Sequence, residues 1–367
     1  MTTITTMTTA KKIKVAIGLS GGVDSAVAAY LLKQQGYDVI GLHLKLHEGI
    51  DPMHQRACCS LDSSLDARLV AHQLEIPFYV INMKDDFKRY VMDPFVQDYR
   101  AGRTPNPCIE CNKYIKFGTF LDKAKQLGCD LLATGHYAKI YQADGRYRIK
   151  VAEDAAKDQT YMLYGLSQYQ LSHIIMPLGD IENKAAVRQI AQELKLNAAT
   201  TADSQDICFV PDDDHVAFLQ EQPGGFTPGE FVLKEKVIGR HGGIEQYTVG
   251  QRKGLGISWE EPLYVTKLEP ISNRVYLGTA SDVFGKELTG INLNLIFEDL
   301  SPGDERDVDA KIRYSQKSYP AKLQVGENGS FRVIFKDSVR AITPGQSVVF
   351  YYKSDLYGGG IIDQKID

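Results

Sequence analysis

Residues 18–25 read Gly-Leu-Ser-Gly-Gly-Val-Asp-Ser, and this stretch, called the phosphate loop below, decides the fold of the amino-terminal half. The apolar run 13–17 before it is typical of a short buried strand, and residues 25–32 after it favour a helix with an apolar face. Gly21 and Gly22 allow the backbone to approach a ligand closely. Backbone N–H groups in such a turn and at a helix N-terminus favour an anion such as a phosphate.

The phosphate loop differs from two common phosphate-binding motifs. No lysine precedes its closing Ser25, so it is not a Walker A loop, and it lacks the G-x-G-x-x-G spacing of dinucleotide-binding folds. Ser20 and Ser25 add hydroxyl donors, and Asp24 is placed to hold Mg2+ near the phosphates. The pattern S-G-G-x-D-S resembles the loop of enzymes that split ATP into AMP and pyrophosphate. The simpler alternative is a serine–glycine turn that only caps a helix.

Strands and helices alternate from the phosphate loop to about residue 137. Further strands are predicted at 39–44, 78–81 and 130–134, and helices at 60–74, at 85–99 with an interruption at Pro94, and through 117–127. This alternation favours an α/β domain with a parallel sheet that has helices on both faces. Ligands of such sheets lie at the carboxyl ends of the strands. Ser20, Leu44 and Gly135 all fall there, so one nucleotide is expected to touch all three.

The pattern changes near residue 212, where turn-rich segments appear at 211–214 and 222–225. Short strands then follow at near-regular spacing, which favours a small antiparallel barrel or sandwich: 264–268, 274–277, 311–314, 331–335 and 347–352. We therefore expect four parts: a flexible tail (1–11), a catalytic α/β domain (12–212), a small central domain (213–280) and a carboxyl-terminal β-barrel (281–367).

Composition limits the range of functions. The chain has 367 residues with 43% hydrophobic and 24% charged residues, as in ordinary globular proteins. The net charge of −4 provides no global positive field, so any contact with RNA must come from local basic patches. No apolar run reaches membrane-spanning length, and no secretion signal is evident, so a cytoplasmic protein without a membrane partner is expected. Its six cysteines should then be mostly reduced and point to catalysis or metal binding.

Three cysteines attract attention. Cys108 and Cys111 lie in a loop rich in proline and glycine (residues 101–112, the cysteine loop), and Cys208 lies far later in the chain. One interpretation is half of a zinc site completed by Cys58 and Cys59. A second is sulfur chemistry on a thiolate, and a third is an iron–sulfur cluster on three cysteines. The spacing leaves these three interpretations open.

Taken together, the motifs resemble those of the tRNA-specific 2-thiouridylase family, from about Lys12 to the last residues. They are G-L-S-G-G-V-D-S at 18–25, G-R-T-P-N-P-C-I-E-C-N-K at 102–113, A-T-G-H-Y at 133–137, K-D-Q-T-Y at 157–161, D-S-Q-D-I-C-F at 203–209, G-Q-R-K-G-L-G at 250–256, T-P-G-Q-S at 343–347 and G-G-G-I-I at 358–362. The phosphate loop alone would also suit a GMP, NAD or argininosuccinate synthetase. The resemblance implies a PP-loop catalytic domain of the adenine-nucleotide alpha hydrolase type, followed by the two smaller domains.

The resemblance also implies a reaction that uses ATP and Mg2+. ATP adenylates the C2 oxygen of the wobble uridine in tRNA and releases pyrophosphate; sulfur then replaces the activated oxygen, and AMP leaves. Cys208 would carry a persulfide, and Cys111 would release its sulfur, leaving a Cys111–Cys208 disulfide. Asp24 would complete the catalytic set. The implied partners are a tRNA with a wobble uridine and a persulfide-donating sulfur carrier or cysteine desulfurase.

Site residues are implied in the same way. Those expected to bind ATP are Gly18, Leu19, Ser20, Gly21, Gly22, Val23, Asp24, Ser25, Leu44 and Gly135. Those expected to contact tRNA are Asn106, Pro107, Cys108, His136, Lys157, Asp158, Gln159, Arg313, Tyr314 and Gln346. Many relatives carry Asp where this chain has Cys108, and a third thiol strengthens the alternative of an iron–sulfur cluster on Cys108, Cys111 and Cys208.

Two other classes of function compete. One is a PP-loop ligase or amidotransferase that acts on a small molecule, which needs an ammonia source for which the sequence offers no candidate. The other is a non-catalytic RNA-binding or metal-binding relative with a relict loop. The intact Ser20, Asp24 and Ser25 argue against the second alternative.

Overall fold

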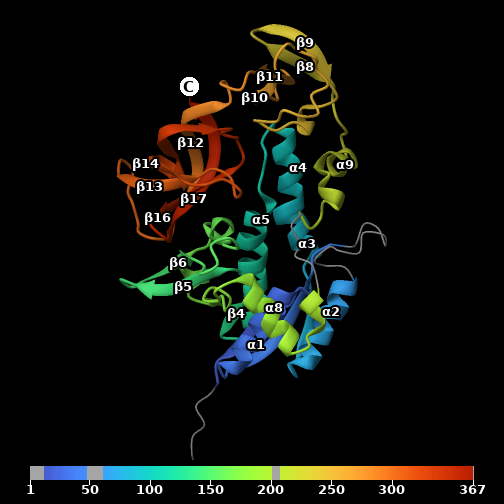
Figure 1. Cartoon of the computed structure of the whole chain (residues 1–367), viewed down its shortest axis with the longest axis vertical. Coiled ribbons are helices and arrows are strands. Elements are labelled where there is room, and N and C mark those ends of the chain that lie inside the picture. Colours follow the sequence, from blue (N-terminus) through green and yellow to red (C-terminus); the bar gives the residue numbers. More distant parts are fainter. Residues whose placement is uncertain (1–11, 48–60, 201–206, 367) are drawn as a thin grey trace, which may run out of the picture.

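The computed structural model describes residues 12–47, 61–200 and 207–366. Figure 1 shows an α/β domain in blue and green at the lower end, a small yellow-orange sheet at the upper end, and a red-orange barrel beside the helical segment that runs between them. Within the described residues, no helix has the length and apolar character needed to cross a bilayer. Residues 1–11, expected to form a tail, lie outside the described residues.

The amino-terminal sheet is parallel, as expected. Its strand order is β3-β2-β1-β4-β7, with β1 (Lys14–Gly18), β2 (Asp38–Lys45), β3 (Phe78–Asn82), β4 (Leu131–Ala133) and β7 (Ile174–Ile175). β1 lies in the middle because its residues are apolar on both faces. The loop that follows β1 therefore emerges near the centre of the carboxyl edge, where ligands of parallel sheets bind.

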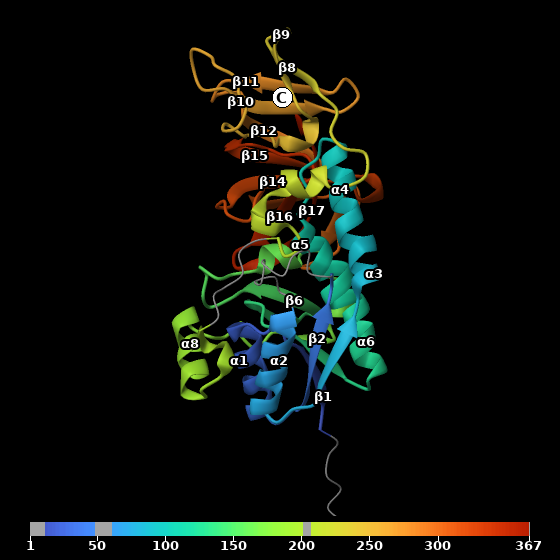
Figure 2. The same ribbon diagram turned by 90° about the vertical axis from the view of Figure 1, so that its right-hand side faces the viewer.

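Helices cover both faces of this sheet (Figure 2). Val15 and Ile17 of β1 share one core with α1 (Val23–Gln34), α2 (Leu61–Gln73) and α8 (Lys184–Glu193). Ala16 points to the opposite core, which contains Phe117 and Phe120. The helical segments on that side are α3 (Lys84–Phe87), the π-helix η1 (Lys88–Met92), α4 (Asp93–Arg100), α5 (Pro107–Glu110), the π-helix η2 (Cys111–Thr119) and α6 (Phe120–Gln126).

The interruption expected at Pro94 takes a milder form. Pro94 lies in the first turn of α4, and helical backbone continues before it through η1. Pro94 has no N–H to donate, and it is tolerated because the hydrogen-bond register of the helix already shifts in the π-helical turn before it. The helix therefore continues through this position.

An antiparallel hairpin that the sequence pattern does not indicate lies between β4 and the segment around residue 160. β5 (Ala138–Ala143) and β6 (Arg146–Val151) pair in antiparallel fashion, with a turn at Asp144 and Gly145. Charged residues on both strands obscured the alternating pattern. Short elements follow: η3 (Thr160–Leu163), α7 (Gln168–Leu171), η4 (Asn197–Thr200), η5 (Pro211–Asp213) and α9 (His215–Gln220).

The central domain is a four-stranded sheet. Its order is β10-β11-β8-β9, with β8 (Gly229–Leu233), β9 (Lys236–His241), β10 (Tyr264–Glu269) and β11 (Arg274–Gly278), followed in the chain by the barrel. Phe231, Val265 and Val275 form part of its core together with the 3-10 turn η6 (Ile244–Gln246).

The carboxyl-terminal domain is a closed antiparallel barrel of six strands. The strands are β12 (Phe284–Leu295), β13 (Glu305–Lys311), β14 (Tyr319–Val325), β15 (Phe331–Arg340), β16 (Ser347–Tyr352) and β17 (Asp355–Ile366), with the 3-10 turn η7 (Glu327–Gly329). Pairing of β12 with β17 closes the barrel. The predicted strand at 311–314 is wrong: β13 ends at Lys311, and Arg313 and Tyr314 lie in the turn that follows.

Candidate active site

The phosphate loop connects β1 to α1, as predicted. Gly21 has φ +84°, and a Cβ there would lie 2.7 Å from the Ser63 carbonyl oxygen, so only glycine fits. The Ser20 N–H donates to the Ser25 hydroxyl oxygen at 3.2 Å, and that hydroxyl donates to the Gly22 carbonyl at 3.0 Å. These contacts hold the loop in a tight turn at the N-terminus of α1.

The residues expected to bind ATP lie at the same edge of the sheet. Leu44 is near the carboxyl end of β2, and Gly135 follows β4. A Cβ at Gly135 would lie 2.8 Å from the Ser25 backbone nitrogen, so the segment after β4 packs directly on the phosphate loop. The His43 Nδ1 lies 2.8 Å from the Leu19 carbonyl oxygen and fixes the other side of the loop. Glycine at positions 21 and 135 keeps the space around the loop open, because a Cβ at either position would clash with its neighbours. This open space beside backbone N–H groups suits a chain of phosphates.

Asp24 has two partners from distant segments. The Tyr137 hydroxyl donates to its Oδ1 at 2.6 Å, and the Lys184 Nζ lies 2.7 Å from both carboxylate oxygens. Lys184 is 12% exposed and Asp24 32% exposed, so the pair is half shielded from water. The carboxylate expected to hold Mg2+ is thus already neutralised by a lysine.

The prediction of a loop through residue 112 is wrong in its second half: residues 107–112 are helical, in α5 and the start of η2, and carry both thiols. Asn106 caps α5, because its side-chain oxygen accepts a hydrogen bond from the Cys108 N–H at 3.2 Å. Cys108 is exposed and Cys111 is buried. The Asn112 amide donates to the Met162 carbonyl at 3.0 Å and ties this helix to η3. Pro107 is buried at the start of α5.

Cys208 lies in a turn that the Val210 N–H closes on the Ile207 carbonyl at 2.9 Å. The neighbouring Phe209 packs edge-on against Phe95, with ring centroids 5.2 Å apart. Cys111 is a buried member of the same large apolar core, and Cys208, half-buried, packs against that core. The structure therefore brings to one core two cysteines that are far apart in sequence.

A metal site is not formed by the described residues. Among them, no three Cys, His, Asp or Glu side chains are grouped so that they could hold a metal ion. Cys108, Cys111 and Cys208 therefore do not fit an iron–sulfur cluster in this arrangement. The zinc alternative depended on Cys58 and Cys59, which lie outside the described residues.

The residues expected to contact tRNA in the segment 157–159 have internal partners as well. The Tyr137 N–H donates to the Gln159 side-chain oxygen at 2.9 Å, and the Gln159 N–H donates to the Tyr137 carbonyl at 3.0 Å. Burial raises the pKa of Asp158, whose carboxylate accepts from the Thr160 hydroxyl at 2.6 Å. The Tyr314 hydroxyl donates to the Asp158 carbonyl at 3.1 Å. Lys157, half-buried, precedes them.

Two other residues expected to contact tRNA are directed into the protein. The Arg313 guanidinium donates to the Val249 carbonyl at 2.9 Å and the Thr343 hydroxyl at 2.6 Å, and burial lowers its pKa. It therefore links the barrel to the central domain. Burial also lowers the pKa of His136 well below its usual value, and its Nδ1 lies 2.8 Å from the Thr134 hydroxyl. His136 is therefore a buried, neutral imidazole, and its contact with tRNA stays a prediction.

Gln346 holds the cysteine loop. Its amide donates to the Thr104 carbonyl at 2.9 Å and the Pro105 carbonyl at 3.2 Å. The Thr104 N–H in turn donates to the Pro344 carbonyl at 2.9 Å. Gly345 has φ +90°, and a Cβ there would lie 2.7 Å from the Thr104 nitrogen. The barrel segment 343–347 thus packs its backbone directly on the loop that precedes Cys111.

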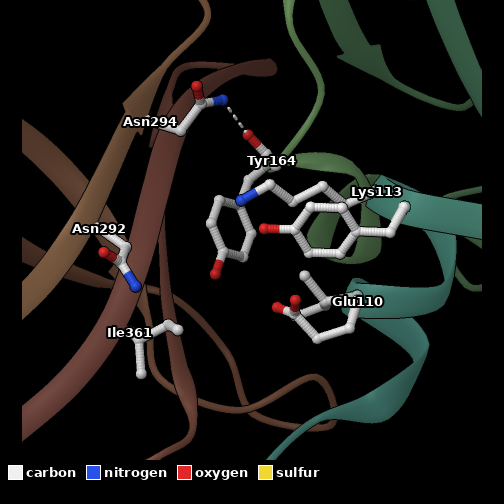
Figure 3. A pocket seen from close by; sticks show the side chains of 9 residues that line it. Glu110, Lys113, Tyr164, Asn292, Asn294 and Ile361 are labelled. Carbon is white, nitrogen blue, oxygen red and sulfur yellow. Dashed lines mark hydrogen bonds between the residues drawn. The ribbon is translucent and has the colours of Figure 1, made fainter. Parts of the chain in front are cut away.

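A small cavity lies between the helix of Cys111 and the barrel (Figure 3). Its volume of about 50 Å³ leaves room for a few water molecules and excludes a nucleotide. Burial raises the pKa of Glu110 on its wall, and the charge of Lys113 opposes this shift. The Asn294 amide donates to the Tyr164 carbonyl at 2.5 Å on the barrel side. The remaining labelled residues of the wall are Asn292 and Ile361.

Sequence reasoning missed three residues of this region. Tyr137 and Lys184 meet Asp24, and Lys311 lies over the rings of Tyr161 and Tyr314, with its Nζ 5.7 and 5.3 Å from their centroids. One signal was available for Lys184: a phosphate loop without a lysine needs a cation from elsewhere in the chain. No comparable signal marked Tyr137 or Lys311.

The parallel sheet, the phosphate loop at its carboxyl edge and the attached barrel define a multidomain protein of the PP-loop class. Family models match three segments: the tRNA methyl transferase HUP domain at residues 13–212, the tRNA methyl transferase PRC-barrel domain at 217–279 and the Aminomethyltransferase beta-barrel domain at 286–362.

Curated relatives match along almost the whole chain. A tRNA-specific 2-thiouridylase MnmA of Clostridium perfringens is 50% identical over 96% of this chain and 99% of its own length. A second, of Clostridium beijerinckii, is 49% identical over 97% of this chain and 100% of its own length. The chain belongs to the tRNA-specific 2-thiouridylase family. Among solved structures, a 4-thiouridine synthetase–RNA complex with bound ATP is similar at 14% identity, with a TM-score of 0.33 over 56% of this chain and 49% of that one.

Proposed function

We propose that this protein is an ATP-dependent sulfurtransferase that converts the wobble uridine of tRNA to 2-thiouridine. The observation that carries the proposal is the pairing of two sites in one chain of this family: a phosphate loop without a Walker lysine, and Cys111 and Cys208 at one core. The first suits release of pyrophosphate from ATP, and the second suits transfer of sulfur.

The first step activates the base. The C2 oxygen of uridine is a poor leaving group. It attacks the α-phosphorus of ATP, pyrophosphate leaves with the bridging oxygen, and the oxygen on C2 is now part of an adenylate that can depart as AMP, a good leaving group. The backbone N–H groups of the phosphate loop would bind the phosphates, while Leu44 and Gly135 would border the nucleotide. Asp24 would hold Mg2+, whose charge offsets that of the phosphates.

The second step delivers sulfur. Cys208 would carry a persulfide accepted from a sulfur-carrier protein or a cysteine desulfurase. The Cys111 thiolate attacks the Cys208 sulfur, a Cys111–Cys208 disulfide forms, and hydrosulfide leaves with the electron pair. Hydrosulfide adds to C2, and AMP departs with the original oxygen. An external thiol then reduces the disulfide, and the reducing conditions of the cytoplasm suit this last step.

The target base must leave its stack to reach this site. Asn106, Pro107 and Cys108 would border it, because they directly precede Cys111. Tyr314, which is 40% exposed, is placed to stack on a base, and Lys157 with Lys311 supplies positive charge beside it. Asp158, Gln159 and Gln346 would act on tRNA through the segments they hold in place.

The test is a pyrophosphate-release assay with and without unmodified tRNA, combined with detection of 2-thiouridine. AMP and pyrophosphate should form in a tRNA-dependent way, and thiolation should require a persulfide donor. ADP and phosphate as products would exclude the proposed chemistry at the phosphate loop. Ammonia-dependent turnover of a small molecule would instead support a ligase.

A further inference from the structure

Lys184 reaches the phosphate loop from α8, a helix that lies far from the loop in sequence and packs on α1. It is the first residue of α8, and its backbone N–H donates to the Asp154 carboxylate at 2.9 Å. The Asn183 side chain caps the same helix by accepting from the Ala186 N–H at 2.9 Å. Val187 of α8 is buried against the core of α1, which begins at the loop. Three contacts therefore fix the origin of the lysine side chain.

The end of this side chain is equally well placed. Its Nζ lies 2.7 Å from both oxygens of Asp24, within the sequence that binds phosphate, and 5.8 Å from the centre of the Tyr137 ring. Only 12% of the lysine side chain is exposed. Holding this lysine against a carboxylate, shielded from water, costs side-chain entropy and hydration. An exposed ion pair that served only structure would not carry this cost.

The charge of the loop supplies a reason for this arrangement. ATP carries several negative charges, and Asp24 adds another at the same place. The loop lacks a lysine of its own, so only its backbone dipoles and Mg2+ would offset these charges. An ammonium that is already at the loop offsets one of them without any reorganisation of the backbone.

We infer that Lys184 is a catalytic residue which supplies this loop with its phosphate-binding cation, and that its ammonium moves from Asp24 to the β- and γ-phosphates when ATP and Mg2+ bind. Asp24, released from the lysine, would then be able to hold Mg2+, which would supply further positive charge at the phosphates. When the uridine oxygen attacks the α-phosphorus, the bond from that phosphorus to the bridging oxygen breaks. The electron pair goes to pyrophosphate, whose added charge Lys184 and Mg2+ stabilise.

The inference rests on the proposed function, and a binding measurement separates the two. Calorimetry with Mg2+ and either inorganic pyrophosphate or AMP compares the wild type with Lys184→Gln, Lys184→Met and Lys184→Arg. Glutamine can still donate to Asp24, so this variant should keep the fold. We expect Lys184→Gln and Lys184→Met to weaken pyrophosphate binding by about tenfold or more. AMP binding should stay within twofold, because AMP has no β- or γ-phosphate, and Lys184→Arg should restore most of the affinity.

Lys139→Gln is the matched control. Lys139, on β5, also pairs with two carboxylates, Glu153 at 2.8 Å and Asp180 at 2.9 Å, and neither of these belongs to the phosphate loop. This variant should bind pyrophosphate as the wild type does. In a single-turnover assay, Lys184→Gln should slow pyrophosphate release by about 100-fold.

Each outcome decides the question. Equal pyrophosphate affinity in the wild type, Lys184→Gln and Lys184→Met would overturn the inference and leave a structural ion pair. Equal losses for AMP and pyrophosphate would also overturn it, because they would indicate general disorder of the loop. If the wild type binds both ligands and thiolates no tRNA, the proposed function fails and the assignment of Lys184 stands.

Discussion

Removing the side chain of Gln346 tests whether the barrel positions the cysteine loop. The change Gln346→Ala eliminates the hydrogen bonds to the Thr104 and Pro105 carbonyls. Each such bond contributes about 0.5–1.5 kcal/mol net, so the loop should lose about 1–3 kcal/mol of local stability. Since about 1.4 kcal/mol is a factor of ten, hydrogen exchange at the Thr104 amide should accelerate about 5- to 150-fold.

The assay combines hydrogen exchange of residues 101–107 with the thiolation rate at saturating tRNA. We expect faster exchange at Thr104, whose N–H donates to Pro344, together with slower thiolation and nearly unchanged ATP affinity. Gln324→Ala is the control, because the Gln324 amide donates to the Glu305 carboxylate within the same barrel rather than to the cysteine loop. Unchanged exchange at Thr104, with the entire loss of activity due to weaker tRNA binding, would refute the positioning role.

Three further predictions concern chemistry and pH. Asp24→Ala should abolish formation of both AMP and pyrophosphate; retention of either product at the wild-type rate would remove Asp24 from the mechanism. Cys111→Ser and Cys208→Ser should each abolish thiolation and leave part of the adenylation, whereas Cys108→Ser should keep substantial activity; thiolated tRNA from Cys208→Ser would contradict the persulfide route. Burial holds the pKa of His136 below its unfolded value, so its contribution to stability is present above about pH 6.5 and is lost as the pH falls. His136→Asn should therefore flatten the fall in unfolding free energy between pH 7 and pH 5, measured by urea titration, and an unchanged slope would contradict this account.

The elements with strong periodicity could be predicted from the sequence. The apolar run before Gly18 and the alternation of strands with helices led to the parallel sheet, because β1 must be buried on both faces. The hairpin of β5 and β6 escaped, since charged residues on its strands mask a period of two. The error at 311–314 has a different origin: Ile312 is buried like a strand residue, although it follows the end of β13.

The candidate site shows a different limit. Motifs identified the phosphate loop and the cysteines because their chemistry is local to a few residues. They did not identify Lys184, which meets Asp24 only through the packing of α8 on α1. Motifs also did not reveal that Arg313 and Gln346 bond to backbone carbonyls at domain junctions. The tRNA contacts of these two residues stay predictions. The partner of a long polar side chain depends on tertiary packing and cannot be derived from its neighbours in sequence.

The β5–β6 hairpin connects the α/β domain, which carries Asp24, to the carboxyl-terminal barrel. Its first residue follows Tyr137, the partner of Asp24, and its second strand joins the barrel where Lys150 pairs with Asp355. The Tyr141 hydroxyl reinforces this seam with a hydrogen bond to the Asp355 carboxylate at 2.7 Å. A rotation of the barrel would therefore have to bend or break this hairpin. The barrel and the α/β domain should consequently unfold in one transition, and separating them would expose an unpaired strand edge on each side.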